Sequence, residues 1–375
     1  MAEIQKHEFI RLIKLLFGIR RGIPDSRPGR NLYGFRQPKS ILWCIMLKLK
    51  GKKILVTGAG GFIGSRLTEK LLKSEAAVTA LVRYTSGGKA GWLEYLSPAG
   101  KKKLRLIRGD IRDPDICNRA VSDSDYIFHL AAQIAIPFSY IAPRDFLMVN
   151  ALGTANLLQA AREAKVEKFL HVSTSEVYGT AQYVPIDENH PQTAQSPYAA
   201  SKIAADRMVQ SFYLSFGLPT VTVRPFNCYG PRQSARAIIP TIILQALRGK
   251  TVRLGNINPR RDMNYVDDIV EGLINACFNQ NSSGKTINLA TGIDHSIEEL
   301  VSYVSDTLGK RLFIKTEKRR VRPKKSEVQR LSGDSTLARM IIGYRPKYEI
   351  KSGLKKAIAF YEKHLSLFGE EDYQL

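Results

Sequence analysis

The sequence predicts an α/β fold with a doubly wound parallel sheet and a smaller domain interleaved with it at the C-terminal end. Two observations carry this prediction. From Lys52 onward, short apolar stretches rich in β-branched residues alternate with helix-length amphipathic segments, which is the pattern of repeated strand–helix–strand units. The chain has 375 residues of which 44% are hydrophobic, so it can bury the core that such a sheet requires.

The first predicted unit, KKILVTGAGGFIGSRLTEKLL, consists of a strand, a glycine-rich turn and a helix. Glycines at this spacing let the backbone approach a pyrophosphate, and the free N–H groups at the start of the helix attract its charge. Because a strand precedes the turn and a helix follows it, a Rossmann-like dinucleotide site is favoured over a plain tight turn. The residues expected to bind the cofactor here are Gly58, Gly61, Phe62, Ile63 and Gly64.

The end of the second predicted strand, AVTALVR, indicates which dinucleotide binds. An acidic residue at this place would bond the ribose 2′-hydroxyl of NAD, whereas an arginine suits the 2′-phosphate of NADP. Here Arg83 follows Val82, and no Asp or Glu stands at the strand end. We therefore expect NADP in preference to NAD, which stays the alternative.

The third and fourth predicted strands end in residues placed to line the same cofactor. LRLIRGDIRD ends in Asp110 and Ile111, which we expect beside the adenine. DYIFHLAAQ ends in Leu130, Ala131 and Ala132, a loop of mostly small residues expected alongside the ribose and nicotinamide. Each of these residues alone would be unremarkable. Their position directly after a strand of this series is the reason to expect them at the cofactor.

A later strand is followed directly by hydroxyl and carboxyl groups. In HVSTSEVYGT, Thr174, Ser175 and Glu176 stand at the mouth of an apolar strand, where polar groups cost free energy unless they are used. Further on, SPYAASK places Tyr198 and Lys202 four residues apart and therefore on one helix face. Because an ammonium beside a phenol favours the phenolate, we expect a lowered pKa for Tyr198 and a role as general base.

Taken in order, these motifs make the chain resemble the extended short-chain dehydrogenase/reductase family, and within it the nucleotide-sugar 4,6-dehydratases. The resemblance runs from about Lys52 to the C-terminus. The stretches around Tyr198 and RPFNCYGPRQSARAIIPTII are most similar to dehydratases acting on NDP-N-acetylglucosamine in legionaminic-acid-type pathways, part of surface-glycan or nonulosonic-acid biosynthesis. The motifs that carry it are VTGAGGFIGS, GDIRD, HLAA, STSEVYG, SPYAASK, RPFNCYGPRQ, RDMNYVDD and RPKKSEVQRL.

The resemblance implies a role for each catalytic residue. Tyr198, supported by Lys202, takes the proton of the sugar 4-hydroxyl while C4 gives a hydride to the nicotinamide, and Thr174 hydrogen-bonds O4. Glu176 then removes the C5 proton, Ser175 assists departure of the 6-hydroxyl, and the hydride returns to C6. Ser175 stands where the dTDP-glucose enzymes have Asp and the GDP-mannose enzymes have Ser.

The resemblance also implies a substrate side and a homodimer. Loops of the second half would close over a nucleotide diphosphate, whose oxygens suit the arginine fork. Helices within 150–164 and 196–216 would pair between two copies as a four-helix bundle. The residues expected to contact the substrate are Asn227, Arg232, Arg261 and Arg322, with Arg224 as a further candidate.

Three other functions stay open at this point. UDP-glucuronate decarboxylases share the serine form of the STSE motif, so this motif alone does not separate water elimination from decarboxylation. NDP-sugar 4-epimerases of the same family usually lack a glutamate at the position of Glu176. A dinucleotide-binding regulatory protein without activity is the alternative from another class, but the intact set of Tyr198, Lys202 and Glu176 favours an enzyme.

The expected organisation has three parts. Residues 46–225 form mainly the dinucleotide-binding domain, and residues 226–375 mainly the substrate-binding domain, with segments that return to the first. Residues 1–45 are a basic leader without a counterpart in the family, and they are either a disordered segment with an amphipathic helix that contacts a membrane surface or a mis-called start before Met46.

Composition limits the partners and the compartment. The formal charge of +23 raises nucleic acid as a partner, but the basic clusters lack interleaved aromatics and any nucleic-acid motif, so we expect none. The four cysteines lie far apart without metal-ligand spacing. We therefore expect no metal site, no disulfide framework and a cytoplasmic location.

Overall fold

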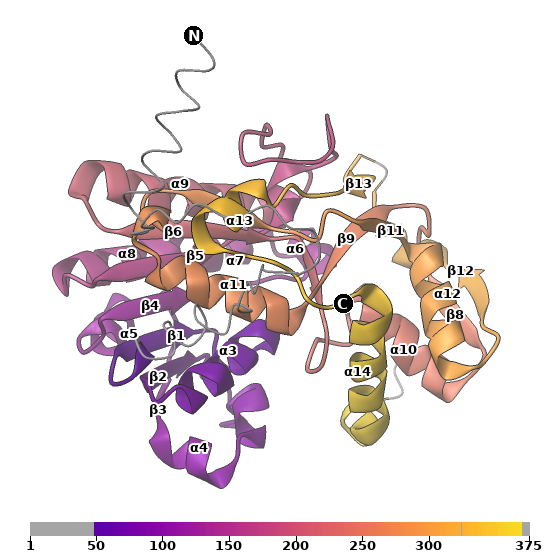
Figure 1. Cartoon of the computed structure of the whole chain (residues 1–375), viewed down its shortest axis with the longest axis horizontal. Coiled ribbons are helices and arrows are strands. Elements are labelled where there is room, and N and C mark those ends of the chain that lie inside the picture. The colour runs from indigo at the N-terminus through magenta and orange to yellow at the C-terminus, as the bar shows by residue number, and fades with distance from the viewer. Residues whose placement is uncertain (1–48, 324, 370–375) are drawn as a thin grey trace, which may run out of the picture. The chain divides into compact units, whose positions relative to one another are not determined.

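The computed structural model describes residues 49–323 and 325–369, and every structural statement below concerns these residues (Figure 1). The predicted leader of residues 1–45 lies outside them, and so do the interpretations made for it. Across the described ranges, no helix combines the length and the apolar character needed to cross a membrane.

A seven-stranded sheet forms the centre of the fold, and all its neighbouring strands pair in parallel. The first strand of the chain lies inside the sheet, and the chain winds outward from it in both directions, which is the strand order of dinucleotide-binding folds with one strand added. The predicted Rossmann-like α/β class is therefore confirmed. In their order across the sheet, the strands are β10 (Thr286–Leu289), β6 (Thr220–Pro225), β5 (Lys168–Val172), β4 (Tyr126–His129), β1 (Lys53–Thr57), β2 (Ala77–Val82) and β3 (Leu104–Arg108).

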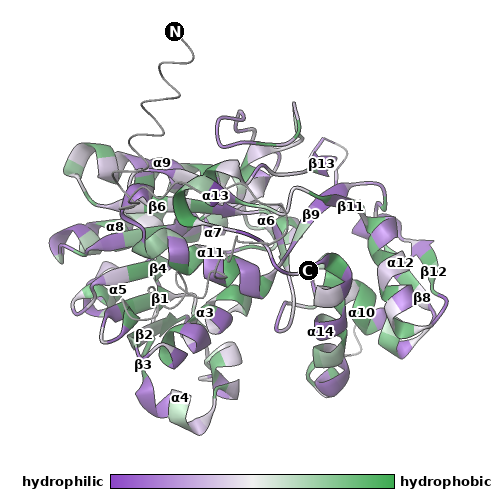
Figure 2. Cartoon of the chain, in the orientation of Figure 1, coloured by the Kyte–Doolittle hydropathy of each residue, from purple (hydrophilic) through white to green (hydrophobic). Residues whose placement is uncertain are grey.

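Helices cover both faces of this sheet because its strands are apolar on both sides. In β1, Ile54 and Val56 belong to one hydrophobic core and Leu55 to the other. Figure 2 shows hydrophobic colouring concentrated in the central strands and mixed colouring on the helices. On the first face lie α3 (Phe62–Lys73) and α11 (Val266–Phe278), and on the second lie α5 (Pro114–Val121), α8 (Gly153–Glu163) and α9 (Pro197–Phe216).

A smaller region is interleaved with the large sheet. Its strands come from the second half of the chain. Two other elements of that half belong to the large region: strand β10 extends its sheet, and helix α11 packs on one face of it. Its four-stranded sheet contains β7 (Asn227–Tyr229), β9 (Arg260–Tyr265), β11 (Asp294–Ser296) and β13 (Arg330–Leu331), and a parallel pair contains β8 (Thr251–Leu254) and β12 (Phe313–Thr316). Its helices are α10 (Ile238–Arg248), α12 (Ile297–Leu308) and α14 (Ile350–Lys363), while α13 (Thr336–Ile342) contacts β10.

Short helical elements complete the described chain. They connect the longer elements, and several of them contribute residues to the site described below. They are α4 (Pro98–Lys103), α6 (Ile136–Ser139), α7 (Pro143–Leu147), the π-helix η2 (Met148–Leu152) and the 3₁₀ helices η1 (Gly91–Tyr95), η3 (Ser175–Tyr178), η4 (Gln280–Ser282), η5 (Lys318–Arg320) and η6 (Leu365–Leu367).

Candidate active site

A cavity of about 1130 Å³ lies beyond the carboxyl ends of the central strands, and residues of both regions line it. Such a position, where the strand order reverses, is the usual ligand site of an open α/β sheet. The predicted site residues that line it are Gly58, Gly61, Phe62, Ile63, Gly64, Arg83, Asp110, Ile111, Leu130, Ala131, Ala132, Thr174, Ser175, Glu176, Tyr198, Lys202, Asn227, Arg261 and Arg322.

The glycine turn after β1 forms a cradle made of backbone. Gly58 has φ +66°, and a Cβ on it would lie 2.8 Å from the Ala131 nitrogen of the next strand end. A Cβ on Gly64 would collide with the Gly58 carbonyl oxygen. Gly61 caps the start of α3, where no side chain accepts from the free N–H groups. These residues fit a dinucleotide, because backbone and helix dipole can meet its pyrophosphate directly.

Charged side chains stand at the far end of this cradle. Arg83 and Lys89 are exposed and line the cavity beyond β2. Asp110 follows β3, and Arg112 donates to its carboxylate at 2.7 and 3.0 Å. This hydrogen bonding lowers the pKa of Asp110 against the opposing effect of burial. The cofactor end therefore offers two cations without a carboxylate at the end of β2.

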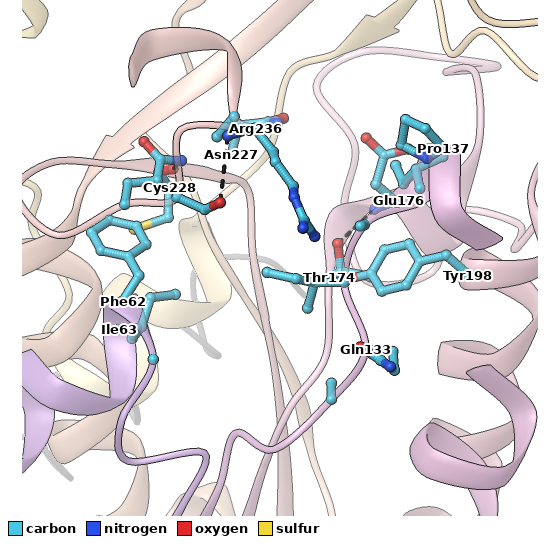
Figure 3. A pocket seen from close by; sticks show the side chains of 18 of the residues that line it. Phe62, Ile63, Gln133, Pro137, Thr174, Glu176, Tyr198, Asn227, Cys228 and Arg236 are labelled. Carbon is cyan, nitrogen blue, oxygen red and sulfur yellow. Dashed lines mark hydrogen bonds between the residues drawn. The ribbon is translucent and has the colours of Figure 1, made fainter. Parts of the chain in front are cut away.

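The candidate acid–base groups lie on the turn after β5. Thr174 is the N-cap of η3, and its hydroxyl accepts from the Glu176 backbone N–H at 3.2 Å. The Glu176 side chain is 9% exposed, and Ser175 beside it is buried. In Figure 3, Thr174 lies beside the ring of Tyr198, with Glu176 on the same side of the cavity. Two hydroxyls and a carboxylate thus face the same space as the phenol.

Tyr198 and Lys202 extend from one face of α9, as their spacing predicts. The Lys202 ammonium donates to the Val172 carbonyl at 2.9 Å, which fixes it under the end of β5. Burial lowers the pKa of Lys202 to about 8, with Asp206 opposing the shift. Burial also raises the pKa of Tyr198, against a hydrogen bond with Thr174. The expected lowering of the Tyr198 pKa is therefore not found in the free chain, because the loss of water outweighs the hydrogen bond and the charges of Glu176 and Asp206 add to the rise.

The substrate end of the cavity contains a cluster of arginines around one carboxylate. Arg261 and Arg322 lie 3.5 and 3.8 Å from Glu327, and Asn227 lines the same cavity. Burial lowers the pKa of Arg261, while the charges of Glu176 and Glu327 oppose this shift. Two guanidinium groups that share one carboxylate leave donors available for a further anion.

Two predicted arginines do not line this cavity. Arg224 is 4% exposed and donates to Asp206 at 2.9 and 3.1 Å. Arg232 donates to Glu69 of α3 at 2.9 Å and to the Ser65 hydroxyl at 3.3 Å. Their expected place beside a diphosphate is corrected here, because protein carboxylates in reach already occupy both guanidinium groups.

The structure adds cavity residues that the sequence analysis missed. Arg236 stands in the loop before α10, and Figure 3 shows its side chain extending toward Thr174 and Tyr198. Gln133 and Glu327 also line the cavity. Arg236 lies in the RPFNCYGPRQSARAIIPTII stretch, but sequence alone gave no reason to prefer it to Arg232 four residues earlier.

A parallel doubly wound sheet, a glycine cradle and a Tyr-x-x-x-Lys pair in one cavity define a nicotinamide-dinucleotide-binding protein of the short-chain dehydrogenase/reductase class. The profile of the GDP-mannose 4,6-dehydratase family matches residues 55–357, and the chain belongs to this family. The predicted membership of the extended dehydrogenase/reductase family is thereby confirmed.

Individual relatives carry two different names. The chain is 34% identical to a dTDP-glucose 4,6-dehydratase of Streptomyces griseus over 84% of its own length and 95% of the relative. It is 33% identical to a UDP-glucose 4-epimerase of Mycolicibacterium smegmatis over 82% of its length and 98% of the relative. A UDP-glucuronic acid 4-epimerase of Bacillus cereus, solved with UDP-glucuronic acid and NAD, matches with TM-score 0.75 and 28% identity over 83% of this chain and 99% of that one.

Proposed function

We propose that this protein is a nucleotide-sugar 4,6-dehydratase that converts an NDP-N-acetylglucosamine-type sugar to the 4-keto-6-deoxy sugar. The observation that carries the proposal is the carboxylate of Glu176, which shares one cavity with the phenol of Tyr198 and lies next to Thr174 and Ser175. A reaction that only oxidises and reduces C4 needs the phenol alone, whereas elimination of water across C5 and C6 needs a second base.

The first step is oxidation at C4. A dinucleotide held by the glycine cradle would supply the hydride acceptor for C4 and the hydride donor for C6. Tyr198 takes the O4 proton, Thr174 donates a hydrogen bond to O4, and Lys202 provides the positive charge that stabilises the phenolate. The resulting C4 ketone makes the neighbouring C5–H acidic enough for a carboxylate to remove.

The second step is elimination. Glu176 removes the C5 proton, and the 6-hydroxyl departs with a hydrogen bond from Ser175. The departing group takes up one proton, equivalent to the one that Tyr198 removed from O4, and leaves as water. When hydride returns to C6, the acid form of Glu176 gives a proton back to C5. The balance is one water lost from the sugar, with no net change in the dinucleotide.

The arginine cluster suits the diphosphate of the substrate. Arg261 and Arg322 can each offer a fork of N–H donors to phosphate oxygens, as they now do to Glu327. Asn227 and Arg236 then remain for the sugar and its substituent. The choice of an N-acetylglucosamine-type substrate and of a glycan pathway rests on two stretches, around Tyr198 and after Arg224, that resemble dehydratases of that class.

For the cofactor we propose NADP. Arg83 and Lys89 stand where the ribose of the adenosine would lie, and no carboxylate at the end of β2 competes for a 2′-hydroxyl. The solved neighbour in complex with NAD represents the alternative.

We further propose a cytoplasmic homodimer. Leu147, Leu152, Leu214 and Phe216 are exposed around the predicted dimer helices, and a second copy of the chain would cover them. Light scattering that gives a monomer at every concentration would contradict the dimer. The described cysteines are unpaired, which agrees with a reducing compartment.

A 4-epimerase is the second candidate, favoured by the name of the Mycolicibacterium smegmatis relative. It would use Tyr198 and Lys202 for the same oxidation and then return the hydride to C4. The two candidates differ in the need for Glu176 and in the mass of the product.

The deciding experiment incubates the purified protein with a panel of nucleotide-activated N-acetylhexosamines and measures product mass. A dehydratase gives a product lighter by one water, and in deuterated water this product carries deuterium at C5. Glu176→Gln should slow elimination by about 10²- to 10⁴-fold while reduced nicotinamide and a bound 4-keto sugar accumulate. Glu188→Gln is the matched control, because that carboxylate lies outside the cavity lining. A product of unchanged mass would instead establish the epimerase.

A further inference from the structure

Two buried charged residues, one on the catalytic helix α9 and one on the strand β6 beside it, have no part in the reaction described so far. Asp206 is 5% exposed and Arg224 is 4% exposed, and neither lines the cavity. A buried ion pair is weak evidence for stability, because removing both charges from water costs about as much as their attraction returns. The burial of this ion pair is therefore better explained by a role at the site than by a contribution to stability.

Asp206 continues the stripe of catalytic residues along α9. Tyr198, Lys202 and Asp206 follow one another at intervals of one helical turn, so they share one face of the helix. Between Lys202 and Asp206 lies His171 of β5, whose Nε2 is 3.3 Å from the Lys202 ammonium and 3.4 Å from an Asp206 oxygen. The second Asp206 oxygen accepts two N–H groups of Arg224.

In the described part of the chain, Asp206 is the anion whose charge acts on Lys202. Burial lowers the pKa of His171 to about 4 and that of His129, on the neighbouring strand, well below its usual range, so both rings are neutral near pH 7. Burial raises the pKa values of Tyr178 and Tyr198, so both phenols are neutral as well.

Asp206 is held ionised by its partners. Hydrogen bonding with His171 and the charge of Arg224 lower its pKa to about 2, against the opposing effect of burial. Glu176 is the further carboxylate on this side, and it faces the cavity and Arg261. Asp206 is therefore the counter-charge that two buried cations, Lys202 and Arg224, share.

Arg224 connects this cluster to the turn that carries the second base. Its guanidinium donates to the Tyr178 hydroxyl at 2.9 Å and lies 5.0 Å from the centre of that ring. Tyr178 is the last residue of η3, the same short turn that contains Ser175 and Glu176. The Tyr178 hydroxyl in turn donates to the Asn288 side chain of β10 at 2.8 Å.

We propose that Asp206 and Arg224 are positioning residues that join the two catalytic bases, Asp206 by supplying the counter-charge that keeps Lys202 protonated beneath Tyr198, and Arg224 by sharing that charge and anchoring the turn of Glu176. The proton content of Lys202 then depends on the balance between the two. Burial lowers the pKa of Lys202 to about 8, and the charge of Asp206 opposes a further fall. The role in catalysis rests on the proposed function, but the charge balance does not.

The test measures the titration of Lys202 in the full chain without substrate. Lysine labelled with ¹³C at Cε gives NMR signals that shift with pH, and the signal missing in Lys202→Met identifies the residue. The wild-type protein should titrate at a pKa of about 8. Asp206→Asn should lower this value by about 1 unit or more, because a counter-charge is lost. Arg224→Gln should raise it, because Lys202 then has Asp206 to itself.

The opposite signs distinguish this proposal from a merely structural role. Loosening of the site would admit water and raise the Lys202 pKa toward its ordinary value in both variants. An unchanged or raised value in Asp206→Asn would therefore overturn the proposal. Glu188→Gln is the matched control, because its carboxylate accepts from Asn288 at the far end of the same chain of contacts and should leave Lys202 unaffected.

If Asp206→Asn does not fold because Arg224 is left unpaired, Asp206→Asn/Arg224→Gln decides instead. This double variant has no uncompensated buried guanidinium, and the Lys202 pKa should again fall, whereas a rise or no change overturns the proposal. A second readout is the pH profile of nicotinamide reduction in a single turnover. The step needs charged Lys202, so it slows as pH rises through the Lys202 pKa, and Asp206→Asn should move this limb to lower pH.

The two readouts fail separately. If the protein turns over no sugar nucleotide but the NMR shifts have the expected signs, the dehydratase function fails and the charge balance stands. If water elimination is observed but the Lys202 titration does not respond to Asp206→Asn, the function stands and this proposal fails.

Discussion

The two ends of the cavity are built from different materials. At the cofactor end the cradle next to β1 is backbone, formed by Gly58, Gly64 and the start of α3, which has no side-chain cap. At the substrate end the wall consists of long charged side chains, with Arg261 and Arg322 gathered on Glu327. The sequence analysis identified the residues of the cofactor end one by one. Of the four arginines that it assigned to the substrate end, Arg261 and Arg322 line the cavity, and Arg224 and Arg232 do not.

This difference shows that the role of a glycine can be predicted from its neighbours in sequence, whereas the partner of an arginine cannot. A glycine in a strand–turn–helix motif has its role fixed by neighbours in sequence, because the absent Cβ makes room for nearby backbone. An arginine reaches far and pairs with whichever carboxylate the tertiary structure brings near. Arg224 meets Asp206 and Arg232 meets Glu69 away from the cavity. Arg261 and Arg322 also pair with a carboxylate, that of Glu327, but they do so at the cavity wall.

The largest expected effect is at the backbone end. Gly64→Ala should abolish retention of the dinucleotide and cost about 3 kcal/mol of folding free energy, because the new Cβ collides with the Gly58 carbonyl. This loss would occur although alanine favours helices over glycine. Gly87→Ala, where nothing lies within 4 Å, is the control. Absorbance of bound nicotinamide and thermal unfolding measure both, and a Gly64→Ala protein that still carries its dinucleotide would refute the close-approach argument.

At the side-chain end, Arg322→Ala should raise the KM for the sugar nucleotide about 10- to 100-fold, since a charge-assisted hydrogen bond contributes about 1.5–3 kcal/mol. The kcat should change little. Arg330→Ala is the matched control from the same segment, because its guanidinium pairs with Asp294 and does not line the cavity. Equal KM values for both variants would show that the cluster around Glu327 does not bind the substrate.

A smaller effect is expected where a side chain reads the cofactor. Arg83→Asp should shift the preference from NADP toward NAD by at least about 10-fold, equivalent to about 1.4 kcal/mol. Mass analysis of the dinucleotide released from each purified protein measures the shift. Recovery of NAD from the wild-type protein would remove the argument from Arg83.

The smallest effect concerns an arginine that lies outside the cavity. Arg232→Ala should leave KM unchanged and lower the free energy of unfolding by about 1 kcal/mol, because Glu69 keeps Arg66 and Lys73 as partners. Arg232→Gly should lose less, since the residue has φ +76°, which favours glycine. Urea unfolding measures the stability and steady-state kinetics measure the KM. A raised KM would show that Arg232 does contact the substrate.

The sequence by itself determined the sheet, the glycine cradle and the placement of the proposed acid–base groups. The strand-to-helix alternation, the glycine spacing and the four-residue interval from Tyr198 to Lys202 are local, so their geometry follows from backbone periodicity. The ends of parallel strands must meet at one edge of the sheet, which is why Asp110, Ala131 and Thr174 line a single cavity.

Only the tertiary structure decided which charges pair and what burial does to them. The pKa of Tyr198 is raised in the free chain rather than lowered, because burial outweighs the hydrogen bond with Thr174 and the nearby carboxylates also favour the neutral phenol. Asp206 of α9 pairs with Arg224 of β6 because the fold brings these two elements side by side. Charge pairing and loss of hydration depend on distances between residues far apart in sequence, and the order of residues along the chain does not contain those distances.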